Sequence, residues 1–134
     1  MANGEVDNVP PSELRQLQPT DDLLRVLVKK VWMDRSGLHE AFMLRPNENE
    51  LSVCYDCQPE QCFDLSPQLT RMYGVASLKV NRVTALNLTV VPDSQNHAAI
   101  QGVPHKDVNP TEAEWFASRL AEAATIVDRI KRER

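Results

Sequence analysis

The feature that most constrains this chain is an amphipathic pattern near its C-terminus. Asn109, Pro110 and Glu112 together form a helix start, with a capping side chain, a proline suited to the first turn and an acid three residues after the cap. Apolar residues then recur every three or four positions, at Ala113, Phe116, Leu120, Ala124, Val127 and Ile130. The sequence therefore predicts a helix that runs from 110 to the basic residues at the C-terminus and packs its apolar stripe on another layer.

The preceding segments supply strands for that second layer. Apolar runs bounded by turn residues predict strands at about 38–45, 50–56, 75–80, 88–91 and 98–103. Short helical segments are expected at 67–73 and 81–86. A longer helix is expected at about 21–33, where Thr20 can cap and apolar residues recur at helical spacing, although the stretch 25–28 also fits a strand.

These elements predict one α+β domain. Its mainly antiparallel sheet would have four or five strands and would be packed on one face by the N- and C-terminal helices. A chain of 134 residues can bury a core large enough to fold without disulfides or metal. Residues 1–19 are rich in Asn, Pro and Gln and are expected to form a mobile tail, which leaves 20–134 as the domain.

Charge and hydropathy exclude some classes of function. The formal net charge is −4 and the sequence pI is about 5.3, which weighs against binding to nucleic acid. The basic end, DRIKRER, is interpreted as the solvated terminus of a helix. The chain has no apolar run of about 18 residues and no secretory signal, so we expect no membrane span and a cytoplasmic protein with reduced thiols.

All three cysteines lie in one short stretch, VCYDCQPEQC, with the spacing C-x2-C-x4-C. Cys54 and Cys57 have a spacing that lets two thiolates reach one zinc ion, and Cys62 could be a third ligand. A structural site needs a fourth ligand, which His39, His97 or His105 could supply. His39 is favoured because its predicted strand would pair with the strand that carries Cys54. The alternative is three ordinary reduced thiols.

A second group of reactive residues lies in NHAAIQGVPHKD, which contains His97, His105 and Asp107. A small hydrolase or transferase could pair one of these histidines with a cysteine or serine nucleophile. The sequence has no G-x-S-x-G, no glycine-rich phosphate loop and no H-E-x-x-H motif, so catalysis has little support from motifs.

Two tryptophans lie beside the apolar stripes of the predicted terminal helices. Trp32 is in the first helical pattern, and Trp115, next to Phe116, is in the last. Tryptophan is frequent among residues that anchor protein interfaces. We therefore expect Trp32, Trp115 and Phe116 as candidates for docking to another chain or for self-association.

The run YGVASLKVNRVTALNLTVVPDSQNHAAIQGVP, together with AFMLRPNENELSVCYD, resembles a family of small, uncharacterised bacterial proteins. Its pattern is a Gly-Val-Ala strand, a short helix, a strand ending at Pro-Asp and a His-Ala strand, covering about 22–130. The resemblance implies a compact cytoplasmic domain of bacterial or phage origin and transfers no catalytic residues. The cysteine cluster is not part of that pattern.

From these observations we expect a non-enzymatic, protein-binding accessory domain. Two alternatives remain open: a small domain stabilised by zinc at the cysteine cluster, and an enzyme built around His97 or His105.

Overall fold

The computed structural model describes residues 14–134, and most of the predicted tail lies outside them. In the part of the tail that is described, Arg15 pairs with Asp21 and Asp56 at 2.8 and 2.7 Å, and Leu17 packs against the main core. Within the described residues no helix has the length and apolar character needed to cross a membrane.

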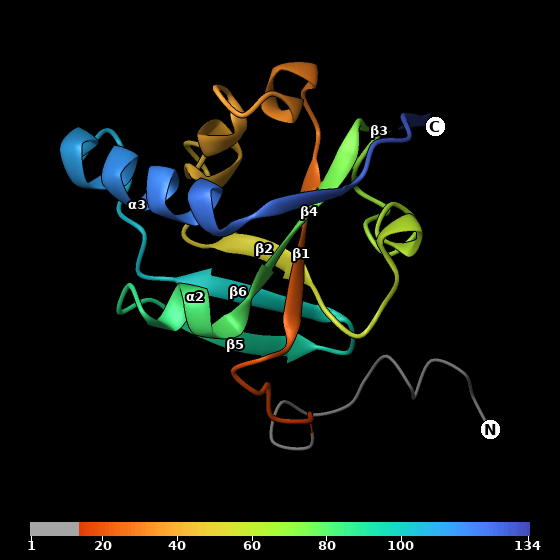
Figure 1. Cartoon of the computed structure of the whole chain (residues 1–134), viewed down its shortest axis with the longest axis horizontal. Coiled ribbons are helices and arrows are strands. Elements are labelled where there is room, and N and C mark those ends of the chain that lie inside the picture. Colours follow the sequence, from red (N-terminus) through yellow and green to blue (C-terminus); the bar gives the residue numbers. More distant parts are fainter. Residues whose placement is uncertain (1–13) are drawn as a thin grey trace.

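An antiparallel sheet of six strands forms the centre of the domain, in the spatial order β5-β6-β2-β1-β4-β7 (Figure 1). Its strands are β1 (Asp22–Leu27), β2 (Leu51–Cys54), β4 (Gly74–Lys79), β5 (Thr89–Ser94), β6 (His97–Gln101) and β7 (Thr125–Asp128). Two short strands, β3 (Arg71–Met72) and β8 (Arg132–Glu133), pair separately.

The helical elements are short except for one. They are α2 (Val80–Thr84), α3 (Pro110–Ala123) and the 3-10 helices η2 (Lys30–Met33), η3 (Leu38–Phe42) and η4 (Pro59–Gln61). The described chain is therefore a single α+β domain, as the sequence predicted, with a larger sheet than the four or five strands expected.

The sheet consists of two halves that meet at a single point. β1 and β4 pair along six residues, from Asp22↔Lys79 to Leu27↔Gly74, and β2 and β6 pair along four. In contrast, β1 and β2 are joined at one register pair, Leu24↔Cys54. β1 crosses β2 at a steep angle (Figure 1), so the two strands separate beyond this pair.

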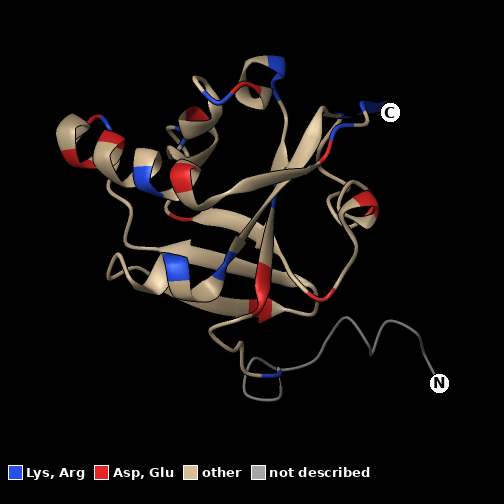
Figure 2. Cartoon of the chain, in the orientation of Figure 1, with Lys and Arg blue, Asp and Glu red and all other residues tan. Residues whose placement is uncertain are grey.

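Each face of the sheet has its own core. The larger core includes residues of η3 and α3, such as Phe42 and Leu120, which are fully buried. The smaller one contains Leu24, Phe63 and Met72 and lies under the chain segment between β2 and β4. β2 and β6 contain no charged residue along their lengths (Figure 2), in keeping with their place inside the sheet.

Several sequence predictions are confirmed. Strands form within or close to the expected ranges 50–56, 75–80, 88–91 and 98–103, and the short helix expected at 81–86 is α2. The start of α3 is also as predicted, because the Asn109 side chain accepts a hydrogen bond from Glu112 N at 3.1 Å and Pro110 is the first helical residue.

The N-terminal helix expected at 21–33 is wrong: β1 occupies its first part and η2 its end. Leu23, Leu24 and Leu27 are all buried although they lie on both faces of the strand, as expected for a strand with a core on each side. Such a continuous apolar run also fits a helix, and pairing with β4, some 50 residues away, decides between them. The alternative strand at 25–28 was therefore closer to the structure.

Three other elements differ from the predictions. The expected strand at 38–45 is the 3-10 helix η3, whose Leu38, Ala41 and Phe42 are buried in the larger core. The helix expected at 67–73 does not form: a turn and a bend occupy 67–70, and the strand β3 follows. The C-terminal helix ends at Ala123, and the rest of its apolar stripe continues as β7, because Ala124 is extended with ψ 148° and β-branched residues follow.

Candidate metal centre

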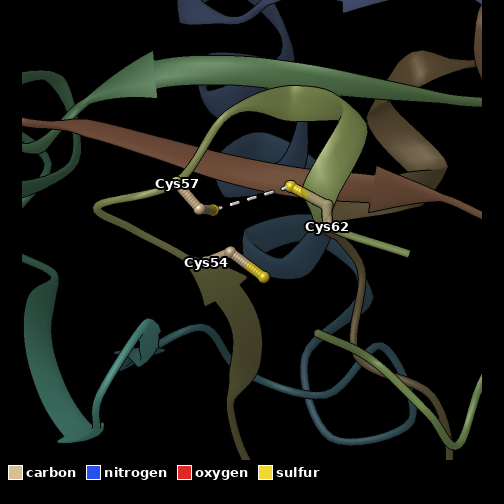
Figure 3. A group of neighbouring side chains, drawn as sticks. All are labelled: Cys54, Cys57 and Cys62. Atoms are coloured by element: carbon tan, nitrogen blue, oxygen red, sulfur yellow. Dashed lines mark hydrogen bonds between the residues drawn. The ribbon is translucent and has the colours of Figure 1, made fainter. Parts of the chain in front are cut away.

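The three cysteine side chains converge beside the end of β2 (Figure 3). Cys54 is the last residue of β2, Cys57 lies in the following turn, and Cys62 is the C-cap of η4. All three Sγ atoms lie within 4.8 Å of one another, and Sγ of Cys57 is 4.0 Å from Sγ of Cys62. The structure thus brings together the thiols that the sequence spacing singled out.

The turn after β2 directs Cys57 back toward Cys54. Asp56 has φ 56°, in the left-handed region that Asp tolerates better than most residues. Asn96, in the β5–β6 turn, holds this turn in place, since its Nδ2 donates to the carbonyls of Tyr55 and Asp56 at 3.1 and 3.0 Å. Two neighbouring turns, one after β2 and one between β5 and β6, therefore fix the position of Cys57.

The start of η4 places Cys62. The backbone N–H of Gln58 donates to Oε1 of Gln61 at 2.7 Å, and the Gln58 side chain accepts from the Gln61 backbone, which makes a reciprocal cap. Pro59 stands at the first turn, and its carbonyl accepts from Cys62 N at 3.1 Å. A single helical turn is enough to return the chain to the other two thiols.

The thiols lie at the border of the smaller core. Cys54 and Cys62 are buried, whereas Cys57 is half-buried. Leu24, Phe63 and Met72 belong to the same cluster. The site is therefore largely shielded from water, with Cys57 on its open side.

The three thiols affect each other's ionisation. The pKa of Cys54 is lowered mainly because the Cys57 and Cys62 thiols donate hydrogen bonds to its thiolate. The pKa of Cys57 is raised to about 11, chiefly because it donates to Cys54, and the pKa of Cys62 is raised because it donates to both other sulfurs. Without a cation, the cluster favours one thiolate and two thiols.

His97 lies across from Cys54 on the neighbouring strand. The two residues are register partners of β6 and β2. Because Tyr55 N donates to Asn96 O in the adjacent pair, Cys54 and His97 form a non-hydrogen-bonded pair, the type in which facing side chains lie closer together. Nδ1 of His97 is 2.5 Å from Oδ1 of Asp93, which leaves Nε2 free of that bond.

The structure does not place the other two histidines with the thiols. His39 lies on η3 among residues of the larger core, and the strand that would have brought it beside Cys54 does not form. His105 lies beyond the end of β6, where its carbonyl accepts from Val108 N and Asn109 N before α3. Asp107 is in the same turn, so β6 separates this pair from His97.

The aromatic docking candidates have different surroundings. Trp32 is only 3% exposed, and the cations of Lys29 and Arg45 lie 5.8 and 5.4 Å from its ring. Trp115 is 48% exposed on α3 and packs edge-on against the half-buried Phe116, with 5.1 Å between ring centroids. Burial therefore disfavours Trp32 as a docking residue, and Trp115 remains available.

The sequence interpretation missed one feature, a buried arginine on β1. Arg25 is 7% exposed and lines a pocket that opens where β1 and β2 separate. The available signal was a single charged residue within the apolar run LLRVLV. A charge in such a run is rarely fully buried unless a specific partner holds it.

Comparisons of the chain with family models, with curated proteins and with solved structures find no match.

Proposed function

We propose that this protein is a small metal-binding domain that holds a zinc ion with Cys54, Cys57 and Cys62. The observation that carries this proposal is the approach of all three Sγ atoms to within 4.8 Å of one another. Sulfur ligands about 2.3 Å from a tetrahedral zinc ion lie about 3.8 Å apart. The distance of 4.0 Å between the sulfurs of Cys57 and Cys62 is close to this value.

The donor set favours zinc over the hard divalent cations. Thiolates are soft ligands that select zinc, copper(I) or iron–sulfur clusters, whereas calcium and magnesium prefer oxygen. A divalent cation would also supply the positive charge that a largely buried group of three thiolates needs. Binding would release the protons that Cys57 and Cys62 hold in its absence.

His97 is the fourth ligand in this proposal. It faces Cys54 across two paired strands, and its Nδ1 contacts Asp93. Histidine ligands generally donate their second ring N–H to a carboxylate or carbonyl, which orients the ring and raises its basicity. Asp93 is placed to do this if His97 binds the metal through Nε2.

The proposed role of the ion is structural. It would join the turn at Cys57 and the end of η4 to the paired ends of β2 and β6. Four protein ligands are typical of a structural zinc site. The proposal places the protein in a reducing compartment such as the cytoplasm, where thiols remain free to bind metal.

Native mass spectrometry of the full-length chain tests the metal proposal. We expect the mass of one bound zinc ion, lost with a strong chelator, and a fall in melting temperature of about 10 °C. That fall follows because a ligand at about 100 times its Kd stabilises by about 2.7 kcal/mol, and a domain of this size loses about 4 °C per kcal/mol.

Variants separate the ligands from the rest of the chain. We expect Cys57→Ser to abolish stoichiometric zinc, and His97→Ala to weaken its binding while His39→Ala, the matched control, leaves it unchanged. A metal-free chain that melts at the same temperature with and without chelator contradicts the proposal. A mass lower by two hydrogens would instead indicate a disulfide between two of the three cysteines.

Protein docking is the second candidate function, and the exposed Trp115 on α3 supports it. Arg119 lies 5.5 Å from the Trp115 ring, and a shallow depression lined by Pro110, Glu114 and Trp115 lies on this surface of the helix. Tryptophan and arginine are the residues most often found as energetic anchors of interfaces. The partner would be a second copy or another protein chain.

Sedimentation at increasing concentration tests the self-docking form of this idea. We expect a dimer whose Kd rises about tenfold or more in Trp115→Ala, since an anchor residue contributes at least about 2 kcal/mol. Arg82→Ala, an exposed change on α2, should leave the Kd unchanged. A monomer at every concentration contradicts self-association.

A further inference from the structure

A pocket of about 450 Å³ lies in the gap between β1 and β2. This volume is in the range of pockets that hold small molecules. Leu24, Val26, Val53, Leu65 and Leu69 supply apolar walls. The pocket exists because the two strands share a single register pair and then separate, so neither backbone nor an apolar side chain closes the space between them.

Arg25 provides the most unusual group of the pocket wall. Its Nε donates to the carbonyl of Ala41 at 2.9 Å, and its Nη1 donates to the carbonyl of Ser52 at 2.8 Å. These bonds leave Nη2 for another acceptor. Among residues 14–134 no carboxylate lies within 4.0 Å of the guanidinium, although the side chain is more than nine-tenths buried.

A buried cation that makes no ion pair is costly, because the charges of Glu48 and Cys54, which are not in contact with it, offset its desolvation only in part. Burial lowers the pKa of Arg25 to about 10, so the group still carries its charge at neutral pH. An anion bound in the pocket would form the ion pair that Arg25 lacks.

The wall of the pocket contains other charged residues besides Arg25. Arg45 lies beside the same pocket, and Glu48 is its one acidic lining residue. Oε1 of Glu48 accepts a hydrogen bond from the backbone N–H of Arg45 at 2.8 Å, which engages that carboxylate at the rim. Cys54, whose pKa is lowered, also lines this pocket, so the two arginines face one carboxylate and one thiolate unless a metal ion neutralises the thiolate.

Trp32 gives a second and independent sign of an absent partner. It lines the pocket, and its Nε1 is the one buried side-chain polar atom of the described residues that has no hydrogen-bond partner. Buried polar groups of native proteins are satisfied in the large majority of cases. A guanidinium without an ion pair and an indole N–H without a hydrogen bond therefore belong to two residues that line one cavity.

We propose that this pocket binds a small organic anion. A carboxylate or phosphate group would accept hydrogen bonds from Nη2 of Arg25, with Arg45 contributing charge, and the apolar part of the ligand would pack on Leu24, Val26 and Leu65. Cys54 and His97 of the proposed metal site also line this pocket, but the groups that would bind the anion belong to Arg25 and Arg45, outside the thiol cluster.

An NMR titration of the full-length chain, as isolated, tests the proposal with three probes. Phenylacetate and phenyl phosphate carry the two head groups, and phenylacetamide is their neutral counterpart. We expect both the Nε–H signal of Arg25 and the indole signal of Trp32 to shift with at least one anion. The indole signal of Trp115, which is on α3 away from this pocket, is an internal control.

The neutral amide should bind at least about tenfold more weakly, since a hydrogen bond to a charged group contributes more than about 1.4 kcal/mol. Arg45→Ala, an exposed change that should not impair folding, is expected to weaken anion binding, whereas Arg82→Ala on α2 is not. The relative affinities of the two anions identify the head group.

The proposal is overturned if neither anion shifts the Arg25 and Trp32 signals at millimolar concentration. Equal binding of the amide and the anions also overturns it, as does an equal response of Arg45→Ala and Arg82→Ala. Because Cys54 and His97 also line the pocket, the titration is repeated after zinc has been removed with a chelator. The metal site is tested separately by the mass of the bound ion, so failure of the pocket and failure of the metal site are distinguishable.

Discussion

Arg25 illustrates how one side chain can replace part of a strand ladder. The pattern of pairing with β6 turns the Ser52 carbonyl toward β1, but β1 has already diverged at that point. Nη1 of Arg25 donates to this carbonyl and so satisfies an acceptor that a regular sheet would have paired with backbone. The arginine has a structural role, and its remaining N–H groups are left for a ligand.

Gly74 is required because the start of β4 lies directly against the end of β7. A Cβ atom at this position would overlap the carbonyl oxygen of Asp128 and the side-chain end of Met33. We expect Gly74→Ala to reduce the free energy of unfolding by about 1–3 kcal/mol, because the backbone of β7 must move away. Urea denaturation measures this change.

Ser77→Ala on the same strand is the matched control for Gly74→Ala. Its side chain is half-buried and has no such overlap, so we expect a change below about 0.5 kcal/mol. Equal stability of the Gly74→Ala variant and the unmodified chain would show that β7 can shift without cost.

Among the elements, those with strong local signals formed as predicted. α3 begins at the expected residue because its cap and first-turn proline act through contacts within four residues. β2 and β4 were predicted because their apolar runs are bounded by turn residues. Local information was sufficient for these segments.

Elements whose conformation depends on pairing with a distant strand were predicted less well. β1 has helical spacing and strand composition at the same time, and long-range pairing decides its conformation. β7 continues the stripe of α3 in sequence, yet Thr125–Asp128 pairs with β4 instead of extending the helix. Periodicity alone does not distinguish such cases, because the deciding contacts are distant in sequence.

At the scale of the whole molecule, the C-terminal Arg134 holds in place the segment that follows the cysteines. The guanidinium of Arg134 donates to the carbonyls of Phe63, Ser66 and Leu69 and lies 3.9 Å from the centroid of the Phe63 ring. β8 pairs with β3 beside it. The C-terminal residues therefore stabilise the segment that follows Cys62 and packs beside the thiol cluster.

We expect Arg134→Ala to raise amide hydrogen exchange at 62–70 by about tenfold, since hydrogen bonds from a charged group contribute about 1.5–3 kcal/mol. Exchange in β1 and β4 should change less, because their pairing does not involve Arg134. Arg129→Ala, an exposed charge change in the same terminal segment, is the control. Unchanged exchange at 62–70 would contradict a supporting role for Arg134.

The candidate site was predicted only in part. The spacing of Cys54, Cys57 and Cys62 was sufficient to single out three thiols, because a turn brings close neighbours together. The choice of His39 rested on a strand that does not form, and His97 faces Cys54 only because β2 pairs with β6. A fourth ligand distant in sequence depends on strand register, which local patterns do not specify.

The sequence by itself determined the α+β class, the start of α3, four of the six strands of the main sheet and the cysteine group, since each depends on composition or on contacts within a few residues. The tertiary structure alone decided that 22–27 is a strand, that the sheet has six strands in two diverging halves, and that Arg25 is buried beside a pocket. These outcomes depend on which strands pair. Pairing is set by the burial of two opposite faces of one sheet, to which residues from every part of the described chain contribute.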